Sequence, residues 1–322
     1  MKCAEAARIE AALRDIPDGT LEILPRGGSA IDARTDGRGR METVAVFPGI
    51  EAAFTAFLGA GVELRHEPRV SVLEVYHCRC GRVGWNMPDG TAIYLGAGDL
   101  SLHGMARCAV SSMVFPLGYS EGLSLAIDLD ALSSECPDIL RDAGFRPCAL
   151  REKLLDRSPI TIPACPAVEG IFEPVYAAPP ALRAPWLKLK AQELLLYLSG
   201  FQPAASEPAR VYAQQTEQIR EVHRLLTTHL DQRLTIEELS KRFLINTSAL
   251  KEGFKAVYGA PIATYMKEAR IRRAMQLLRE TDDTVATIAA QVGYESQGKF
   301  AQAFKDIAHM LPTEYRRAHR TP

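Results

Sequence analysis

Two stretches of this 322-residue chain repeat one pattern of apolar positions, and this repeat constrains the fold of the C-terminal third more than any other feature. The first stretch reads LTIEELSKRFLINTSALKEGFKAVYG and the second reads DTVATIAAQVGYESQGKFAQAFKDIAH. The matching positions are separated by 49 residues before the turn and by 50 after it: Thr235, Leu239, Phe243, Leu250 and Phe254 match Thr284, Ile288, Val292, Phe300 and Phe304. Each copy predicts a short helix, a tight turn at Ile245-Asn246 or Gly293-Tyr294, and a second helix.

A continuous helix is predicted between the two copies, where PIATYMKEARIRRAMQLLRE begins at Pro261 and contains no internal glycine or proline. Such a helix is about 30 Å long, which is close to the roughly 34 Å helical repeat of B-DNA. A helix, a turn and a second helix that enters the major groove make up a helix-turn-helix. We therefore expect residues 211–322 to form an all-α, DNA-binding domain with two helix-turn-helix units in tandem.

Charge divides the chain at the same place. Residues 210–322 carry 18 Lys and Arg against 13 Asp and Glu, whereas the formal net charge of the whole chain is −1. The C-terminal segment is therefore +5 and the remainder −6. This asymmetry favours a polyanionic partner for the C-terminal segment, and double-stranded DNA is the partner we expect.

Between Gln218 and Arg320 the sequence resembles the AraC/XylS family of transcriptional regulators. The resemblance rests on IAAQVGY, KFAQAFK and LPTEYRR, with ARIRRAMQLL as the linker helix. It implies a transcription factor that binds DNA, and RNA polymerase as a partner if the protein activates transcription. The family usually has a phenylalanine-glycine pair before the final proline, where this chain has Ala308-His309-Met310-Leu311.

A second resemblance concerns the effector. The stretch LINTSALKEGFKAVYGAPIATYM is similar to the pyochelin-regulator subgroup of the family (PchR), whose members respond to iron-siderophore complexes. The stretches YLGAGDLSLH, GYSEGLSLAIDLDAL and LKLKAQELLLYL are also similar to that subgroup. This resemblance implies a ferric siderophore as the small-molecule effector.

The second helix of the first copy is expected to present four polar side chains to DNA: Ser248, Lys251, Glu252 and Lys255. The match to the family motif places Ser248, Lys251 and Glu252 at base edges and Lys255 at the phosphates. Lys251 can donate to guanine O6 and N7, and Glu252 can accept from cytosine N4. A solvated helix face would show the same pattern.

The second copy presents shorter side chains, because Gly298 and Ala301 cannot hydrogen-bond to a base. We expect this copy to bind mainly through the DNA backbone. We expect Gln297 and Gln302 to contact adenine. The expected phosphate contacts are Lys299, Lys305 and Arg316.

The first 200 residues have a different pattern of apolar residues from the C-terminal segment. We expect the chain as a whole to be of the α+β class. Short β-prone runs such as METVAVF and RVSVLEVYHCRCG fill residues 21–129 and predict a sandwich or barrel, cupin-like, that binds the effector. The spacing from residue 130 to 200 is helical, and we expect the face with Leu187, Leu194 and Leu198 to pair two subunits, although packing on its own barrel gives the same pattern. Residues 1–200 thus form the effector-sensing and dimerisation domain, and residues 201–210, FQPAASEPAR, form the linker.

The strand around Tyr76 is expected to line the effector cavity. Alternation places Cys78 and Cys80 on the same face as Tyr76. In a barrel this face would line a ligand cavity, and we expect the effector to contact Tyr76, Trp85 and Tyr94.

The cysteines leave an alternative open. Cys78 and Cys80 could supply two thiolates to a metal or form a thiol switch, with His103 and Cys108 nearby in the sequence. Structural zinc sites use C-x₂₋₄-C and a second matching pair, which is absent. We therefore expect no metal and no cofactor, and a metal- or redox-sensing regulator with the same DNA-binding output is the alternative.

Several classes of protein are excluded by missing patterns. The chain contains no G-x-S-x-G, Walker lysine loop, H-E-x-x-H or G-x-G-x-x-G, so we expect no enzyme. A repair regulator of the Ada type would need a four-cysteine zinc site whose spacing is not present. Neither a signal peptide nor an apolar run of about 18 residues occurs, which predicts a cytoplasmic protein without a membrane partner.

Overall fold

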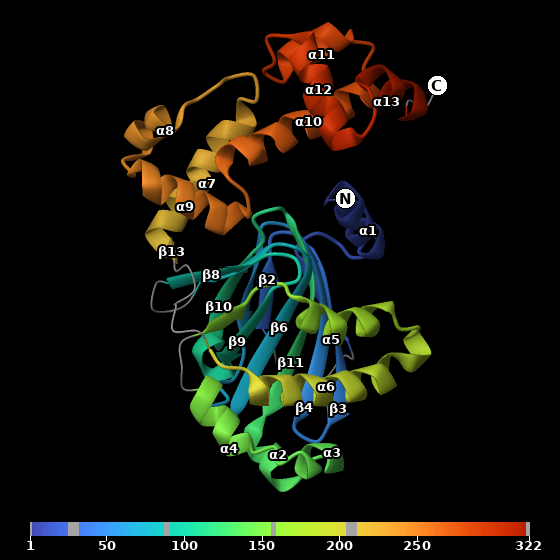
Figure 1. Ribbon diagram of the computed structural model, residues 1–322, viewed down its shortest axis with the longest axis vertical. Coiled ribbons are helices and arrows are strands. Elements are labelled where there is room, and N and C mark those ends of the chain that lie inside the picture. The colour runs from blue at the N-terminus through green and yellow to red at the C-terminus, as the bar shows by residue number, and fades with distance from the viewer. Residues whose placement is uncertain (1, 25–31, 87–90, 156–158, 204–210, 320–322) are drawn as a thin grey trace. The chain divides into compact units, whose positions relative to one another are not determined.

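Two β-sheets face each other in the first unit of the chain, and every described element of the second unit is a helix (Figure 1). The computed structural model describes residues 2–24, 32–86, 91–155, 159–203 and 211–319. The chain divides into two units, Met1–Tyr212 and Ala213–Pro322, and each is described by itself below.

The larger sheet of the first unit has seven strands. In spatial order they are β1 (Thr20–Leu24), β3 (Arg38–Phe47), β4 (Ile50–Leu58), β11 (Tyr119–Asp128), β6 (Val72–Gly81), β9 (Leu100–Gly104) and β12 (Ile160–Ile162). The β1–β3 pair is parallel and the other pairs are antiparallel.

The smaller sheet has six strands, all paired antiparallel. Their order is β13 (Val211–Tyr212), β8 (Thr91–Leu95), β7 (Val83–Asn86), β10 (Val110–Val114), β5 (Gly61–Arg65) and β2 (Asp32–Thr35). Because Val211 and Tyr212 pair with β8, the second unit begins at Ala213, two residues after the start that the sequence predicted for the DNA-binding domain. Most of the predicted linker, residues 204–210, lies outside the described residues.

Alternation along the strands separates two apolar cores. Residues such as Phe57 and Tyr76 point toward the smaller sheet and pack with Trp85 and Met113. Residues on the other face, such as Leu125, pack against helices. The β-rich prediction for residues 21–129 is thus confirmed as a two-sheet arrangement.

Helices surround this sheet pair. They are α1 (Lys2–Ala12), η1 (Met105–Cys108), α2 (Leu129–Ser134), α3 (Asp138–Asp142), α4 (Pro147–Leu150), η2 (Arg151–Leu155), α5 (Pro166–Ala177), η3 (Pro180–Leu182) and α6 (Arg183–Gly200). Figure 1 shows α5 and α6 lying across the seven-stranded sheet.

The leucine stripe of α6 packs inside its own subunit. Leu187, Leu194 and Leu198 are at most 1% exposed and belong to the core between α5, α6 and the large sheet. The prediction that this stripe pairs two subunits is therefore wrong, because these leucines are already buried between α5, α6 and the seven-stranded sheet of the same chain.

Two strands were not expected. The two-residue strand β13 lies at the start of the segment that was predicted to be all-α, where it pairs with β8. The three-residue strand β12 lies within the segment that was predicted to be helical, where it pairs with β9.

The second unit contains seven helices in its described residues: α7 (Ala213–Thr228), α8 (Ile236–Phe243), α9 (Thr247–Tyr258), α10 (Ile262–Glu280), α11 (Val285–Gln291), α12 (Gln297–Ala308) and α13 (Pro312–His319). The predicted helix at residues 261–280 and the predicted short pairs are present. Thr235 and Thr284 are the N-caps of α8 and α11, where their hydroxyl groups accept backbone N–H bonds.

No helix in the described part of the chain has both the length and the apolar character that crossing a membrane requires.

Candidate functional site

The polar face of α9 is exposed, and its apolar face anchors the helix. Leu250 and Phe254 are fully buried, whereas all four predicted contact residues, Ser248, Lys251, Glu252 and Lys255, are exposed. Asn246 starts the helix by accepting a bond from the Ala249 N–H at 2.8 Å. The N-terminal turns of α9 therefore offer hydrogen-bonding groups at the positions from which a recognition helix contacts base edges.

The corresponding helix α12 repeats this division. Phe300 and Phe304 are buried, and the four predicted residues Gln297, Lys299, Gln302 and Lys305 are exposed. The amide of Gln302 is engaged, because its Nε2 donates to the Asp306 carboxylate at 2.7 Å. Lys267 of α10 also binds this carboxylate, at 2.9 Å.

Arg316 differs from the other predicted phosphate contacts. It is half-buried, and its Nη2 donates to the backbone carbonyl of Asp283. Arg270 makes the equivalent contacts before the first helix pair of the second unit. Its guanidinium donates to the backbone carbonyls of Leu230 and Gln232 at 2.9 and 2.8 Å. Both arginines hold the loop that precedes a short helix.

The two turns follow one hydrogen-bonding scheme. The Ile245 N–H donates to the carbonyl of Ser240, and the Tyr294 N–H donates to the carbonyl of Ala289, at 3.2 and 2.9 Å. The left-handed residue before each donor is Leu244 in the first turn and Gly293 in the second. A left-handed leucine is strained, because its Cβ approaches the backbone.

At the end of α12, His309 stands where the AraC/XylS family, which the sequence resembles, usually has a glycine. His309 adopts φ +57° and its N–H donates to the carbonyl of Lys305 at 2.9 Å. Gly259 occupies the same position after α9, with φ +78°. The departure noted in the sequence therefore keeps the left-handed cap but places a side chain on it.

A cavity of about 330 Å³ lies between the two sheets of the first unit. Its apolar wall includes Met41, Phe57, Tyr76, Trp85 and Met113. Polar side chains gather in the rest of the lining, among them Glu51, His66, Glu67, Arg69 and Glu74. A mostly apolar cavity with a few polar groups is the usual form of a small-molecule site.

Two of the three predicted effector contacts lie in this wall. Tyr76 meets Trp85 edge-on with ring centroids 4.9 Å apart, and its hydroxyl lies 3.2 Å from the Thr55 hydroxyl. Burial raises the pKa of Tyr76, which keeps the phenol neutral and able to donate. Tyr94 is not among the lining residues, because it pairs with Gly84 in the β7–β8 ladder and so faces away from Trp85.

The sequence missed the polar part of this lining. Glu74 was the available signal, since it is a carboxylate on the same face of the predicted strand as Val72 and Tyr76. Such a residue usually has a specific partner, because burying an unpaired charge is costly.

Cys78 and Cys80 point to opposite faces of the sheet, so the predicted shared face is wrong. Pairing between β6 and β11 steps from Cys78–Gly122 to Cys80–Glu121, which makes Arg79 the extra residue of a β-bulge. Cys78 packs in the inner core, whereas Cys80 packs against α1.

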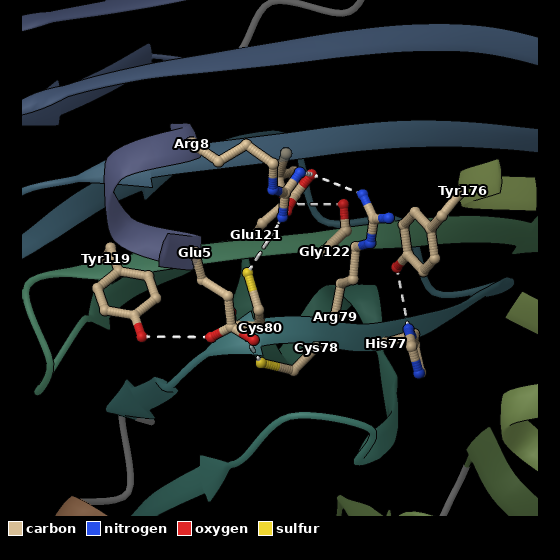
Figure 2. Close-up of polar contacts among 11 residues, drawn as sticks. Glu5, Arg8, His77, Cys78, Arg79, Cys80, Tyr119, Glu121, Gly122 and Tyr176 are labelled. Carbon is tan, nitrogen blue, oxygen red and sulfur yellow. Dashed lines mark hydrogen bonds and ion pairs between the residues drawn. The ribbon is translucent and has the colours of Figure 1, made fainter. Parts of the chain in front are cut away.

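The surroundings of Cys80 favour a neutral thiol. Figure 2 shows it beside Arg8 and Glu121, and its Sγ lies 3.4 Å from Glu121 Oε2. Burial, reinforced by the Glu121 carboxylate, raises the pKa of Cys80 to about 12. Burial likewise raises the pKa of Cys78. A thiol switch needs an accessible thiolate, so this geometry gives no support to redox sensing by the pair.

His77 lies on the outer face with Tyr176, as Figure 2 also shows. Its Nδ1 is 2.9 Å from the Tyr176 hydroxyl, and its ring stacks on Phe172. Burial, aided by the charge of Arg79, lowers the pKa of His77 to about 4. It is therefore a neutral packing residue at neutral pH.

Comparison with known proteins concerns the second unit. Residues 239–318 match the family described as helix-turn-helix domain. A putative AraC-like transcription regulator from Streptomyces lividans is 35% identical over 88 residues, which cover 27% of this chain and 29% of that protein. An HTH-type transcriptional regulator from Staphylococcus aureus strain MSSA476 is 30% identical over 100 residues, 31% of this chain and 13% of that protein.

A solved structure is also similar in this region. The C-terminal domain of AraT, a response regulator from Geobacillus stearothermophilus, is 26% identical with a TM-score of 0.32, over 33% of this chain and 88% of that chain. The chain matches less than a third of the length of each of the two curated relatives, from Streptomyces lividans and Staphylococcus aureus. Together, the family match and the curated relatives support an AraC-type helix-turn-helix domain in the second unit.

Proposed function

We propose that this protein is a cytoplasmic, one-component transcription regulator of the AraC type. Its second unit binds double-stranded DNA through two helix-turn-helix units in tandem, α8–α9 and α11–α12. Its first unit binds a small-molecule effector that controls this binding. The proposal assigns no enzymatic activity to the chain.

The exposed polar faces of α9 and α12 carry the DNA-binding part of the proposal. Each helix begins at a capped N-terminus after a tight turn, and each is anchored by buried apolar side chains, among them Phe254 in α9 and Phe304 in α12. The 19-residue helix α10 joins the two pairs and spans about 28 Å. Two recognition helices connected in this way suit successive major-groove segments on one side of a duplex.

Selection on randomised duplexes tests this part directly. The full-length protein should select a site with two groups of specified base pairs about one helical turn apart. Its affinity should fall steeply as salt rises, because phosphate contacts release counterions. Failure to enrich any sequence, together with salt-insensitive binding, would contradict the proposal.

The cavity between the sheets supports the effector part. At about 330 Å³ it lies at the lower end of the usual range for small-molecule sites, about 300–1,000 Å³. The resemblance to the pyochelin-regulator subgroup extends the proposal to a ferric siderophore. Titrating the protein with a ferric siderophore and with the iron-free form, while following Trp85 fluorescence in a Trp186→Phe background, tests this class of effector.

A homodimer belongs to the same proposal, but through another face of α6. Leu189 and Leu196 are exposed, and Leu182 precedes them at the same seven-residue interval. Apolar residues spaced by seven lie along one side of a helix and suit a second copy of that helix. If the regulator activates transcription, RNA polymerase is a further partner.

A further inference from the structure

Three side chains with metal-binding atoms meet where β6, β9 and η1 come together. Glu74 and His103 are directly opposite each other in the antiparallel β6–β9 ladder. β9 ends at Gly104, and the 3-10 helix η1 that follows turns the chain back so that Cys108 reaches the same place. A carboxylate, an imidazole and a thiol from three elements therefore converge.

Two of the three distances among these atoms match the edges of a tetrahedral site. His103 Nε2 lies 3.3 Å from Glu74 Oε2, and Cys108 Sγ lies 3.5 Å from the same oxygen. All three atoms lie within 4.8 Å of one another. Ordinary zinc bond lengths place a nitrogen and an oxygen ligand about 3.4 Å apart, and a sulfur and an oxygen ligand about 3.6 Å apart.

His103 supplies an independent sign of a missing ligand. Its side chain is 2% exposed, yet Nε2 has no hydrogen-bond partner among the described residues. Glu74 Oε2, 3.3 Å away, forms an ion pair with this nitrogen only if the imidazole is protonated. A buried imidazole nitrogen left without a partner is costly, and coordination of a cation would satisfy it.

We propose that Glu74, His103 and Cys108 bind a divalent transition-metal ion, with zinc as the best match. Nitrogen, sulfur and oxygen ligands together suit zinc, whereas calcium and magnesium prefer oxygen alone. Three protein ligands leave a fourth tetrahedral position for water or another donor. Because Glu74 and Cys108 also line the cavity, the metal site borders the proposed effector site.

Cobalt titration of the full-length protein, after removal of metal by a chelator, tests the site. Binding of Co²⁺ to wild-type protein should give a thiolate-to-cobalt charge-transfer band that saturates at about one equivalent. The ring of His103 lies 6.0 Å from that of Trp85. In a Trp186→Phe background, the same titration should therefore quench Trp85 fluorescence.

Substitutions identify the ligands. Cys108→Ser should abolish the charge-transfer band, and His103→Gln should weaken zinc binding, measured by competition with a chromophoric chelator, by at least about tenfold. Cys148→Ser is the matched control, because Cys148 is an exposed thiol on α4. It should bind both metals as the wild type does.

The outcomes separate cleanly. Circular dichroism shows which variants are folded, and Glu74→Gln replaces Cys108→Ser if the latter does not fold. The proposal is overturned if folded wild-type protein binds neither metal, or if folded ligand variants bind as well as wild type. Since metal binding is measured directly, the result does not depend on whether the second unit binds DNA.

Discussion

The ring of Tyr315 meets the ring of Phe304 edge-on, with centroids 5.5 Å apart and planes at 73°. Tyr265 meets Phe254 in the same way, at 5.5 Å and 78°. Both residues of one pair are 50 positions from their counterparts in the other. The repeat therefore extends beyond the two helix pairs into α10 and α13, and each half of the second unit closes over the same T-shaped aromatic contact.

Lys251→Ala should relax specificity in the half-site that we propose α9 contacts. If Lys251 donates to a guanine edge, its loss costs about 1–3 kcal/mol at one base pair. Binding measurements on a set of single-base operator variants check this. Ala301→Ser on α12 and Lys188→Ala on the exposed surface of α6 are controls that should change little; a sharper loss from Ala301→Ser would reverse the roles of the two helices.

The two turns should respond in opposite directions to substitution at their left-handed residue. Leu244 is 90% exposed and has φ +52°, so Leu244→Gly should relieve strain and raise the stability of the second unit by up to about 1 kcal/mol. Gly293→Ala should lower stability by about 2–3 kcal/mol, because a Cβ there would lie 2.5 Å from the Leu230 carbonyl oxygen. Denaturant unfolding gives both values, and effects of equal sign would contradict the comparison.

Stability of the second unit should decrease in acid through His223. This imidazole stacks on Tyr258 and bonds to the Tyr265 hydroxyl at 2.8 Å. Burial, with a contribution from Arg272, lowers its pKa from 6.5 to about 4. The unfolded chain therefore binds a proton on His223 more readily than the folded chain does. The second unit keeps its full free energy of unfolding above about pH 6.5 and loses on the order of 2 kcal/mol as the pH falls toward 4.

Thermal unfolding of wild type and His223→Gln across this pH range isolates the effect. The glutamine retains a donor for Tyr265 and does not titrate. The wild-type curve should fall relative to the variant curve below pH 6.5, and parallel curves would show that His223 is not responsible.

Leu189→Glu and Leu194→Glu should separate association from folding. Leu189 is 61% exposed, so its substitution should dissociate the proposed dimer without unfolding the first unit. Leu194 is buried against the large sheet, so a carboxylate there should unfold it. Sedimentation velocity with circular dichroism distinguishes the results, and an unchanged dimer in Leu189→Glu excludes this face.

Effector response should depend on the cavity wall and not on the β6 cysteines. Trp85→Ala should weaken the response in a reporter strain, because it removes part of the apolar wall. The double variant Cys78→Ser, Cys80→Ser should keep the response, since the two thiols lie on different faces and are neutral. A double variant that is folded and binds DNA but no longer responds would restore the redox alternative.

The sequence alone determined the helices of the two repeats in the second unit and the helix that joins them. Capping residues such as Thr235 and Thr284 act on backbone groups within one turn, and apolar spacing of three to four residues marks a buried face. These are short-range effects, so they can be recognised without knowing what the helix packs against. The exposed faces of α9 and α12 followed from the same local pattern.

Only the tertiary structure decided which surfaces meet in the first unit. The bulge at Arg79 sends Cys80 away from Cys78, and the register of β7 with β8 turns Tyr94 away from Trp85. Strand register depends on pairing with distant segments, and a shift of one residue exchanges the faces of a strand. The meeting of Glu74, His103 and Cys108 has the same origin, because the β6–β9 ladder and the turn of η1 bring together residues that no local pattern connects.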